Sequence, residues 1–419
     1  MDIDERIEKL NREMIDITKN VSSLNDVILP VLDQITKEII KIQDKQSEIV
    51  KNQQLLMCGD ILHISTADYG NIGDRILSDM VKKTIQYGFE RRIEWSDRGV
   101  GDIFDIREAR YANDNKAIVV GGGGLFFSSE GQKNSWQWNV TGEAIDGLKI
   151  PLFIFGVGYN QFRGQGDIAG NFRQDINKLA RRSEFIGLRN HGSIEAIKKY
   201  LEPENRSKIV WQPCPTTIIS KICPEMNKPG NDSEDKFIAV NMAFDKNELR
   251  FSKDGVSVFN ERMCDVINVL RVLQERYKIK YYSHFDADKP FLSFMDQAGI
   301  RYELVDLFRE DDNDKIYEAY STPELVIGMR GHAQMIPFGL GTPILSIVSH
   351  NKMQWFLEDI GHSEWGVDVR EEDFAQKLYE RALNILNNKE SVKQEISHIQ
   401  DRLFKVTMEN VAKIHKVIE

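Results

Sequence analysis

Apolar positions in the first 56 residues recur with a period of seven. One heptad position holds Ile7, Met14, Val21, Ile28, Ile35, Ile42 and Ile49, and the position three residues later holds Leu10, Ile17, Leu24 and Val31. This spacing is typical of the a and d positions of a coiled coil. We therefore expect residues 1–56 to form a helical coiled coil that joins copies of this chain or recruits another protein. The alternative is a long helix packed on the chain's own globular part.

From residue 57 to 222 short apolar runs alternate with amphipathic stretches. The runs predicted as strands are residues 60–66, 91–96, 116–121, 151–158, 184–189 and 209–213, and the stretches predicted as helices include 76–87, 172–183 and 193–201. This alternation is typical of a parallel sheet with crossover helices. Residues 57–222 are therefore predicted to form one Rossmann-like domain.

A second alternation follows residues 223–236, whose Pro, Gly, Asn and acidic residues predict a linker. Residues 237–370 are predicted to form the second domain. Its strands are expected at 236–243, which begins one residue before the domain, and at 278–284, 301–305, 324–329 and 343–348, with helices at 260–277, 314–320 and 351–360. Residues 371–419 are expected to be helical. The fold class is thus α/β, with two Rossmann-like domains in a glycosyltransferase-B-like arrangement, where ligands bind at the carboxyl ends of the strands.

Composition narrows the classes of function. The 419 residues are 41% hydrophobic and 29% charged, as in a soluble globular protein, and no apolar run is long enough to span a membrane. The net charge of -10 argues against nucleic acid as a partner, so that a phosphate-bearing ligand needs a local basic site. Four cysteines without a CxxC pair predict no metal site, and the charged N-terminus does not match a secretory signal. We expect a cytoplasmic protein.

Two glycine-containing segments follow predicted strands in the first half. Asn71, Gly73 and Asp74 lie where a strand gives way to a helix, so that backbone amides there face an anion or the side chains cap the helix. Gly121, Gly122, Gly123 and Gly124 continue another strand, which predicts a turn that cradles a phosphate or sugar, or a packing turn. Neither segment is a Walker or GxGxxG motif, so ATP and NAD are not indicated.

Charged residues follow other predicted strands. Arg189 ends one strand, and Ser193 is expected to cap the next helix; an arginine there binds an anion or forms a surface ion pair. Arg330 and His332 follow an apolar strand, which suits an anionic substrate and proton transfer. Ser349, His350 and Lys352 follow the next strand as binding candidates. Trp136, Trp138 and Tyr159 are expected to stack on a sugar or fill the core, and Cys214 to serve packing.

The order and spacing of these motifs resemble the polysaccharide pyruvyl transferase family over about residues 60–365. The matching motifs are N-x-G-D (Asn71, Gly73, Asp74), the glycine run (Gly121–Gly123), R-x-x-x-S (Arg189, Ser193) and R-x-H-A with a later G-x-P (Arg330, His332, Ala333, Gly341, Pro343).

The resemblance implies an enzyme that transfers pyruvate from phosphoenolpyruvate, its co-substrate, as a ketal onto two hydroxyls of a glycan sugar. Such enzymes assemble exopolysaccharide, capsule or cell-wall polymers, and a lipid-linked acceptor would bring the chain to the inner face of the membrane. His332 and Arg330 are implied as catalytic residues. Arg189 and Arg330 are implied as donor-binding residues. Gly121, Gly122, Gly123 and Lys352 are expected to bind the donor as well, because they lie at or after predicted strand ends.

Three positions depart from the family pattern. Asn190 and Cys214 stand where the family usually has aspartates, and Gly331 stands where it has an apolar residue. These departures leave two alternatives open. One is a glycosyltransferase that uses a nucleotide-activated sugar on the same fold, and the other is a non-catalytic coiled-coil scaffold of a polysaccharide-assembly complex.

Overall fold

The computed structural model describes residues 9, 10, 12–14, 16, 31, 34–39, 41, 59–66, 71–127, 136–168, 170–226, 236–253 and 255–419. These fall into two compact units, Met1–Cys58 and Gly59–Glu419. In the first unit, the heptad residues Leu10, Met14, Val31 and Ile35 are helical and more than half exposed. The other heptad positions lie outside the described residues, so the coiled coil and the self-association it implies stay predictions.

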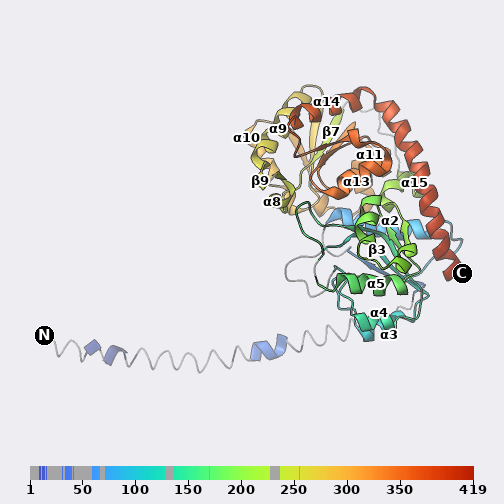
Figure 1. The fold of residues 1–419 in the computed structure, drawn as a ribbon. Coiled ribbons are helices and arrows are strands. Elements are labelled where there is room, and N and C mark those ends of the chain that lie inside the picture. Colours follow the sequence, from blue (N-terminus) through green and yellow to red (C-terminus); the bar gives the residue numbers. More distant parts are fainter. Residues whose placement is uncertain are drawn as a thin grey trace. The chain divides into compact units, whose positions relative to one another are not determined.

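The second unit contains two six-stranded parallel sheets (Figure 1). The first has the order β2-β1-β3-β4-β5-β6, so that the strand order reverses between β1 and β3. Its strands are β1 (Ile61–Ser65), β2 (Trp95–Gly99), β3 (Ala117–Phe126), β4 (Leu152–Tyr159), β5 (Phe185–Leu188) and β6 (Ile209–Trp211). The helices between them are α2 (Ile72–Gln86), α3 (Ile106–Ala112), α4 (Gly142–Gly147), α5 (Phe172–Arg182) and α6 (His191–Lys198). Short helical turns follow at η2 (Pro203–Lys208), η3 (Pro215–Ile218), α7 (Ile219–Ile222) and η4 (Pro224–Met226).

The second sheet has the order β11-β10-β7-β12-β13-β14, and here the order reverses between β7 and β12. Its strands are β7 (Phe237–Asn241), β10 (Lys278–Tyr282), β11 (Tyr302–Val305), β12 (Leu325–Gly328), β13 (Ile344–Val348) and β14 (Gly366–Asp368). Its helices are α9 (Phe259–Leu273), α10 (Phe291–Gln297), α11 (Asn313–Ser321), α12 (His332–Gly339), α13 (Asn351–Ile360) and α14 (Phe374–Asn387). The smaller elements are α8 (Asn247–Arg250), the hairpin β8 (Ser252–Lys253) and β9 (Val256–Ser257), η5 (Asp286–Asp288), η6 (Leu307–Arg309) and η7 (Ser363–Trp365). The predicted α/β fold with parallel sheets is confirmed.

Two predicted elements differ from the structure. The glycine run does not form a turn, because β3 continues through Gly121–Gly124 to Phe126. Gly122 and Gly123 adopt left-handed φ angles of +80° and +102° inside this strand, a conformation that glycine tolerates best. The strand predicted at 91–96 begins only at Trp95, because Arg91 lies in the preceding segment and pairs with Asp60. Most of the predicted linker 223–236 lies outside the described residues.

The C-terminal helix α15 (Lys389–Ile418) connects the two halves, as the red ribbon in Figure 1 shows. It buries apolar residues such as Ile396, Leu403 and Ile414 in a core that contains residues from both sheets. Asn410 Nδ2 donates to the carbonyl oxygen of Trp211 at 2.8 Å, beside the first sheet. The two halves are therefore held together by a shared core. Among the described residues, no helix is both long and apolar enough to cross a bilayer.

A close contact between the halves occurs where α12 ends. A Cβ atom added to Gly339 would lie 1.9 Å from the carbonyl oxygen of Thr216 in η3. Replacing an ordinary helical glycine by alanine stabilises a helix, whereas forcing an atom into this contact costs about 1–3 kcal/mol or more.

We therefore expect Gly339→Ala to lower the free energy of unfolding by about 1–3 kcal/mol or more, as measured by chemical denaturation. Gly166→Ala is the matched control, because nothing lies within 4 Å of the added Cβ there. A Gly339→Ala protein as stable as the wild type would contradict the close packing of η3 against α12.

Candidate functional site

A cavity of about 210 Å³ lies at the carboxyl ends of strands from both sheets. It is next to the two points where the strand order reverses, the usual position of ligands in open α/β sheets. The first half contributes Thr66, Asn71, Asp74, Gly124, Phe127, Gln137, Asn160, Phe162 and Arg189. The second half contributes Asp245, Lys246, Arg250, His284, Arg330, Gly331, His332 and Lys352. The topology thus brings together residues that are far apart in sequence.

Positive charge dominates the lining of this cavity. Among the described residues, its basic side chains are Arg189, Lys246, Arg250, Arg330 and Lys352, and its carboxylates are Asp74 and Asp245. The whole chain carries a net charge of -10, so this excess of positive charge is local. Such a concentration favours an anionic ligand.

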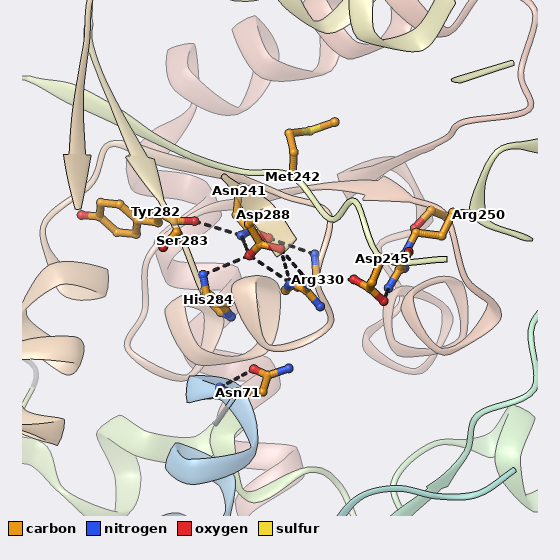
Figure 2. A network of polar contacts seen from close by, with 12 residues as sticks. Asn71, Asn241, Met242, Asp245, Arg250, Tyr282, Ser283, His284, Asp288 and Arg330 are labelled. Atoms are coloured by element: carbon orange, nitrogen blue, oxygen red, sulfur yellow. Dashed lines mark hydrogen bonds and ion pairs between the residues drawn. The ribbon is translucent and has the colours of Figure 1, made fainter. Parts of the chain in front are cut away.

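Arg330 lies between β12 and α12 and forms an ion-pair network with two carboxylates (Figure 2). Its Nε donates to Asp288 Oδ1 at 2.8 Å, and its Nη2 donates to Asp245 Oδ1 at 2.7 Å. Burial alone would lower the pKa of Arg330, but Asp288 and Asp245 together raise it. Arg330 is therefore charged at all relevant pH values and fixed in place.

Asp288 is fully buried and accepts hydrogen bonds from three elements of the second half. Besides Arg330, its donors are Asn241 Nδ2 at 3.1 Å and the backbone N–H of His284 at 3.0 Å. The carboxylate therefore holds the ends of β7, β10 and β12 in register. Figure 2 shows Asp245 on the other side of Arg330, where it also pairs with Arg250 at 3.0 Å.

Arg189 follows β5 and is the one arginine of the cavity with buried nitrogens that lack a hydrogen-bond partner among the described residues. Its side chain lies against Gly158, where an added Cβ would be 2.2 Å from Nε. Burial lowers the pKa of Arg189, while the nearby Cys214 and Asp74 raise it. A buried guanidinium without a bonded carboxylate is unfavourable unless an anion compensates its charge.

Lys352 and His332 have strongly lowered pKa values in this environment. Burial, and then the charges of Arg189 and Arg250, lower the pKa of Lys352 to about 7. Burial, Arg189 and Lys352 lower the pKa of His332 to about 3. At neutral pH His332 is therefore an uncharged imidazole and Lys352 is close to half protonated. Groups with such pKa values occur often at functional sites.

Asn71, Gly73 and Asp74 lie at the beginning of α2. Asn71 caps this helix, as one of the two alternatives predicted, by accepting the N–H of Gly73 at 2.9 Å. Asn71 and Asp74 also line the cavity. Burial raises the pKa of Asp74. Gly73 leaves room for the imidazole, because a Cβ there would be 2.5 Å from His332 Nδ1.

Several other candidates do not line the cavity. Gly121, Gly122 and Gly123 instead accommodate the side chains of His63 and Val81, Leu77, and Thr66, while Gly124 alone of the run reaches the cavity. Their expected contact with the donor is not supported, because the run forms a strand and other side chains of the protein occupy the space next to these three glycines. Trp136 and Trp138 lie in the core, at 4% and 0% exposure.

Three polar candidates support the residues around the cavity. Ser193 does not cap α6; Asn190 does, and Ser193 Oγ accepts the N–H of Tyr159 at 3.0 Å. Ser349 Oγ accepts from Arg250 Nη1 at 3.1 Å. His350 caps α13 by accepting the N–H of Lys352 at 3.2 Å.

Sequence reasoning missed Asp245, Lys246, Arg250, His284 and Asp288. All of them follow β7 or β10, two strands that were predicted, so their position after a strand end was an available signal. Lys246 has φ +54°, the one left-handed non-glycine among the described residues. Its Nζ lies 5.4 Å from the ring centroids of both Phe127 and Phe162. An unusual backbone conformation of this kind clusters at functional sites.

We expect Arg330→Ala to reduce the free energy of unfolding by about 3–5 kcal/mol, because it leaves Asp288 buried without its ion-pair partner. The double variant Arg330→Ala/Asp288→Asn should recover part of this loss in chemical denaturation. Arg309→Ala is the control and should cost at most about 1 kcal/mol, since that arginine is exposed and pairs only loosely with Asp306. Equal stabilities of the single and double variants would argue against the ion pair as the cause.

Comparison with solved structures finds distant likenesses. UDP-GlcNAc 2-epimerase from Neisseria meningitidis bound to UDP-GlcNAc is 10% identical, with coverage of 83% of this chain and 99% of that chain and a TM-score of 0.45. A complex of S. aureus MnaA with UDP is 12% identical over 80% and 90% of the two chains, with a TM-score of 0.44. The wall teichoic acid polymerase TagF is 14% identical over 86% and 89%, with a TM-score of 0.43. At this distance the likenesses do not bear on what this chain binds.

No curated protein sequence matches the chain. The family model for polysaccharide pyruvyl transferase matches residues 30–351, which include every strand of the first half and all but one strand of the second. The match contains the cationic side chains of the cavity up to Arg330, and His332 with them. The chain therefore belongs to the polysaccharide pyruvyl transferase family of polysaccharide-modifying transferases.

Proposed function

We propose that this chain transfers pyruvate from phosphoenolpyruvate to two hydroxyls of one sugar in a cell-surface glycan or its lipid-linked precursor. The observation that carries the proposal is Arg189, a buried guanidinium that has no bonded carboxylate among the described residues, in a cavity whose charged lining is largely basic. Phosphoenolpyruvate carries a carboxylate and a phosphate, so its charge complements this lining. The carboxyl edges of both sheets at one cavity also support a glycosyltransferase-B-like arrangement.

The size of the cavity supports a small donor over a nucleotide-activated sugar. Its volume of about 210 Å³ is below the roughly 300–1,000 Å³ typical of sites for larger organic ligands. The cavity is also not filled by side chains, and Arg189 and Arg330 both line it. An enzyme requires such an open site, whereas a non-catalytic scaffold does not.

We assign the proton transfers to His332 and Lys352. His332, uncharged at neutral pH, is proposed to take the proton of the first sugar hydroxyl once the negative charge of the bound donor offsets the cations that lower its pKa. The hydroxyl oxygen bonds to the central carbon of the donor while the methylene carbon gains a proton. Lys352, with a pKa of about 7, is suited to supply a proton or to hold the phosphate. The carbon–phosphate oxygen bond then breaks, the second hydroxyl bonds to the same carbon, and its proton leaves with the phosphate. The products are one ketal and one phosphate.

Arg189 is proposed to bind the donor, while Arg330, which is already paired, holds the site in shape. We expect phosphoenolpyruvate to bind the wild-type protein in isothermal titration calorimetry and Arg189→Ala to weaken this binding at least tenfold. Arg181→Ala serves as the control, since that arginine is exposed and pairs with Glu202. Tighter binding of UDP-GlcNAc than of phosphoenolpyruvate would favour the glycosyltransferase alternative.

The pKa of Lys352 predicts how binding depends on pH. Its lowered pKa means that Lys352 loses its charge as the pH rises through about 7, so the affinity for a fully ionised phosphoenolpyruvate should fall between pH 7 and 9. Titration calorimetry across this range measures the effect. Lys352→Arg keeps the charge and should flatten the profile. The same decline in wild type and Lys352→Arg would show that another group titrates.

A further inference from the structure

The Cys214 thiol contacts the imidazole of His332 across the two halves of the molecule. Cys214 follows β6 and precedes η3, whereas His332 begins α12. The distance from Cys214 Sγ to His332 Nε2 is 3.8 Å, within reach of a sulfur hydrogen bond. The thiol is 2% exposed, and its second neighbour is Thr216 Oγ1 at 3.1 Å. Nothing in the proposed reaction uses this thiol.

The groups around His332 determine which of the two atoms carries the proton. Burial raises the pKa of Cys214, so the thiol is protonated at neutral pH, and the neutral imidazole can accept from it. Among the described residues, the groups that act on His332 are Arg189 after β5, Cys214 after β6, His284 after β10 and Lys352 of α13. Asp74 of α2 and Arg330 line the same cavity. Burial, and then the charges of Arg189 and Lys352, disfavour protonation of the imidazole.

We propose that Cys214 is a positioning residue, whose thiol donates to His332 Nε2 and holds the imidazole as the neutral Nδ1–H tautomer. The part of Cys214 in catalysis rests on the proposed function: a neutral imidazole with its Nε2 lone pair toward the first half is the base that the sugar hydroxyl meets. When the hydroxyl arrives, the thiol can turn to Thr216 Oγ1, which leaves Nε2 free. A carboxylate at position 214 would instead stabilise the charged imidazolium.

The first test is the tautomer of His332 in the full-length wild-type protein. Histidine labelled with ¹⁵N and ¹³C gives separate signals for the eight histidines, and His332→Asn identifies the one of interest. The proposal requires the Nδ1–H tautomer at pH 7 without any ligand. An Nε2–H tautomer in the wild type would overturn it, whatever the activity of the protein proves to be.

The second test is the pKa of His332 in two variants. Cys214→Asp should raise this pKa by about 1–3 units, because it places a carboxylate beside the imidazole. Arg189 lies close to position 214 and favours the ionised form of that carboxylate. Cys214→Ser keeps a neutral donor and should leave the pKa low. An unchanged pKa in a folded Cys214→Asp protein would contradict the proposal. If pyruvyl transfer is observed, the acid limb of its pH profile should shift to higher pH together with this pKa in Cys214→Asp. In Cys214→Ser the acid limb should stay where it is in the wild type.

Discussion

The arrangement of this protein depends on the burial of several positive charges at one place. Arg189, Arg250, Arg330 and Lys352 come from four separate connections after strands, and each on its own would be destabilised by loss of water. Two carboxylates, Asp288 and Asp245, compensate the charge on the side of the second sheet. On the side of Arg189 and Lys352, no comparable ion pair is present among the described residues, and the pKa values of both groups are lowered. The cavity therefore holds unfavourable positive charge that an anionic donor would relieve.

This division explains why the two arginines of the family motifs have different roles in our account. Arg330 is bound to Asp288 and Asp245, and it connects the ends of β7, β10 and β12. Arg189 has buried nitrogens without partners in the part of the chain that the structure describes, which leaves its charge for a ligand. Burial, and then the charges of Arg189 and Lys352, keep His332 neutral, so the cations that favour an anion also act on the imidazole. Because the shared core and α15 hold the halves together, this positive field is built into the fold.

The sequence predicted the parts of the fold that depend on periodicity. Runs such as Val119 and Val120 in β3 or Val326 and Ile327 in β12 are buried on both faces, and such runs are recognisable without a structure. Arg189, Arg330, His332 and Lys352 were also found, because each follows a recognisable strand. The partners of Arg330 were not. Asp245 and Asp288 follow predicted strands, but which of the acidic residues there reaches Arg330 depends on tertiary contacts. The glycine run was wrongly predicted as a turn, because glycine suits both a turn and a strand that a helix approaches closely. Here Leu77 of α2 packs against Gly122, where a Cβ atom would collide with it.

The most direct test of the account is a crystal structure of the protein soaked with phosphoenolpyruvate. The account predicts that the donor lies in the cavity between the two sheets, with one of its anionic groups hydrogen-bonded to Arg189 and another close to Lys352, while Arg330 keeps its contacts with Asp288 and Asp245. A donor bound elsewhere, or an Arg330 that leaves its carboxylates to bind the donor while Arg189 makes no contact, would contradict the central claim.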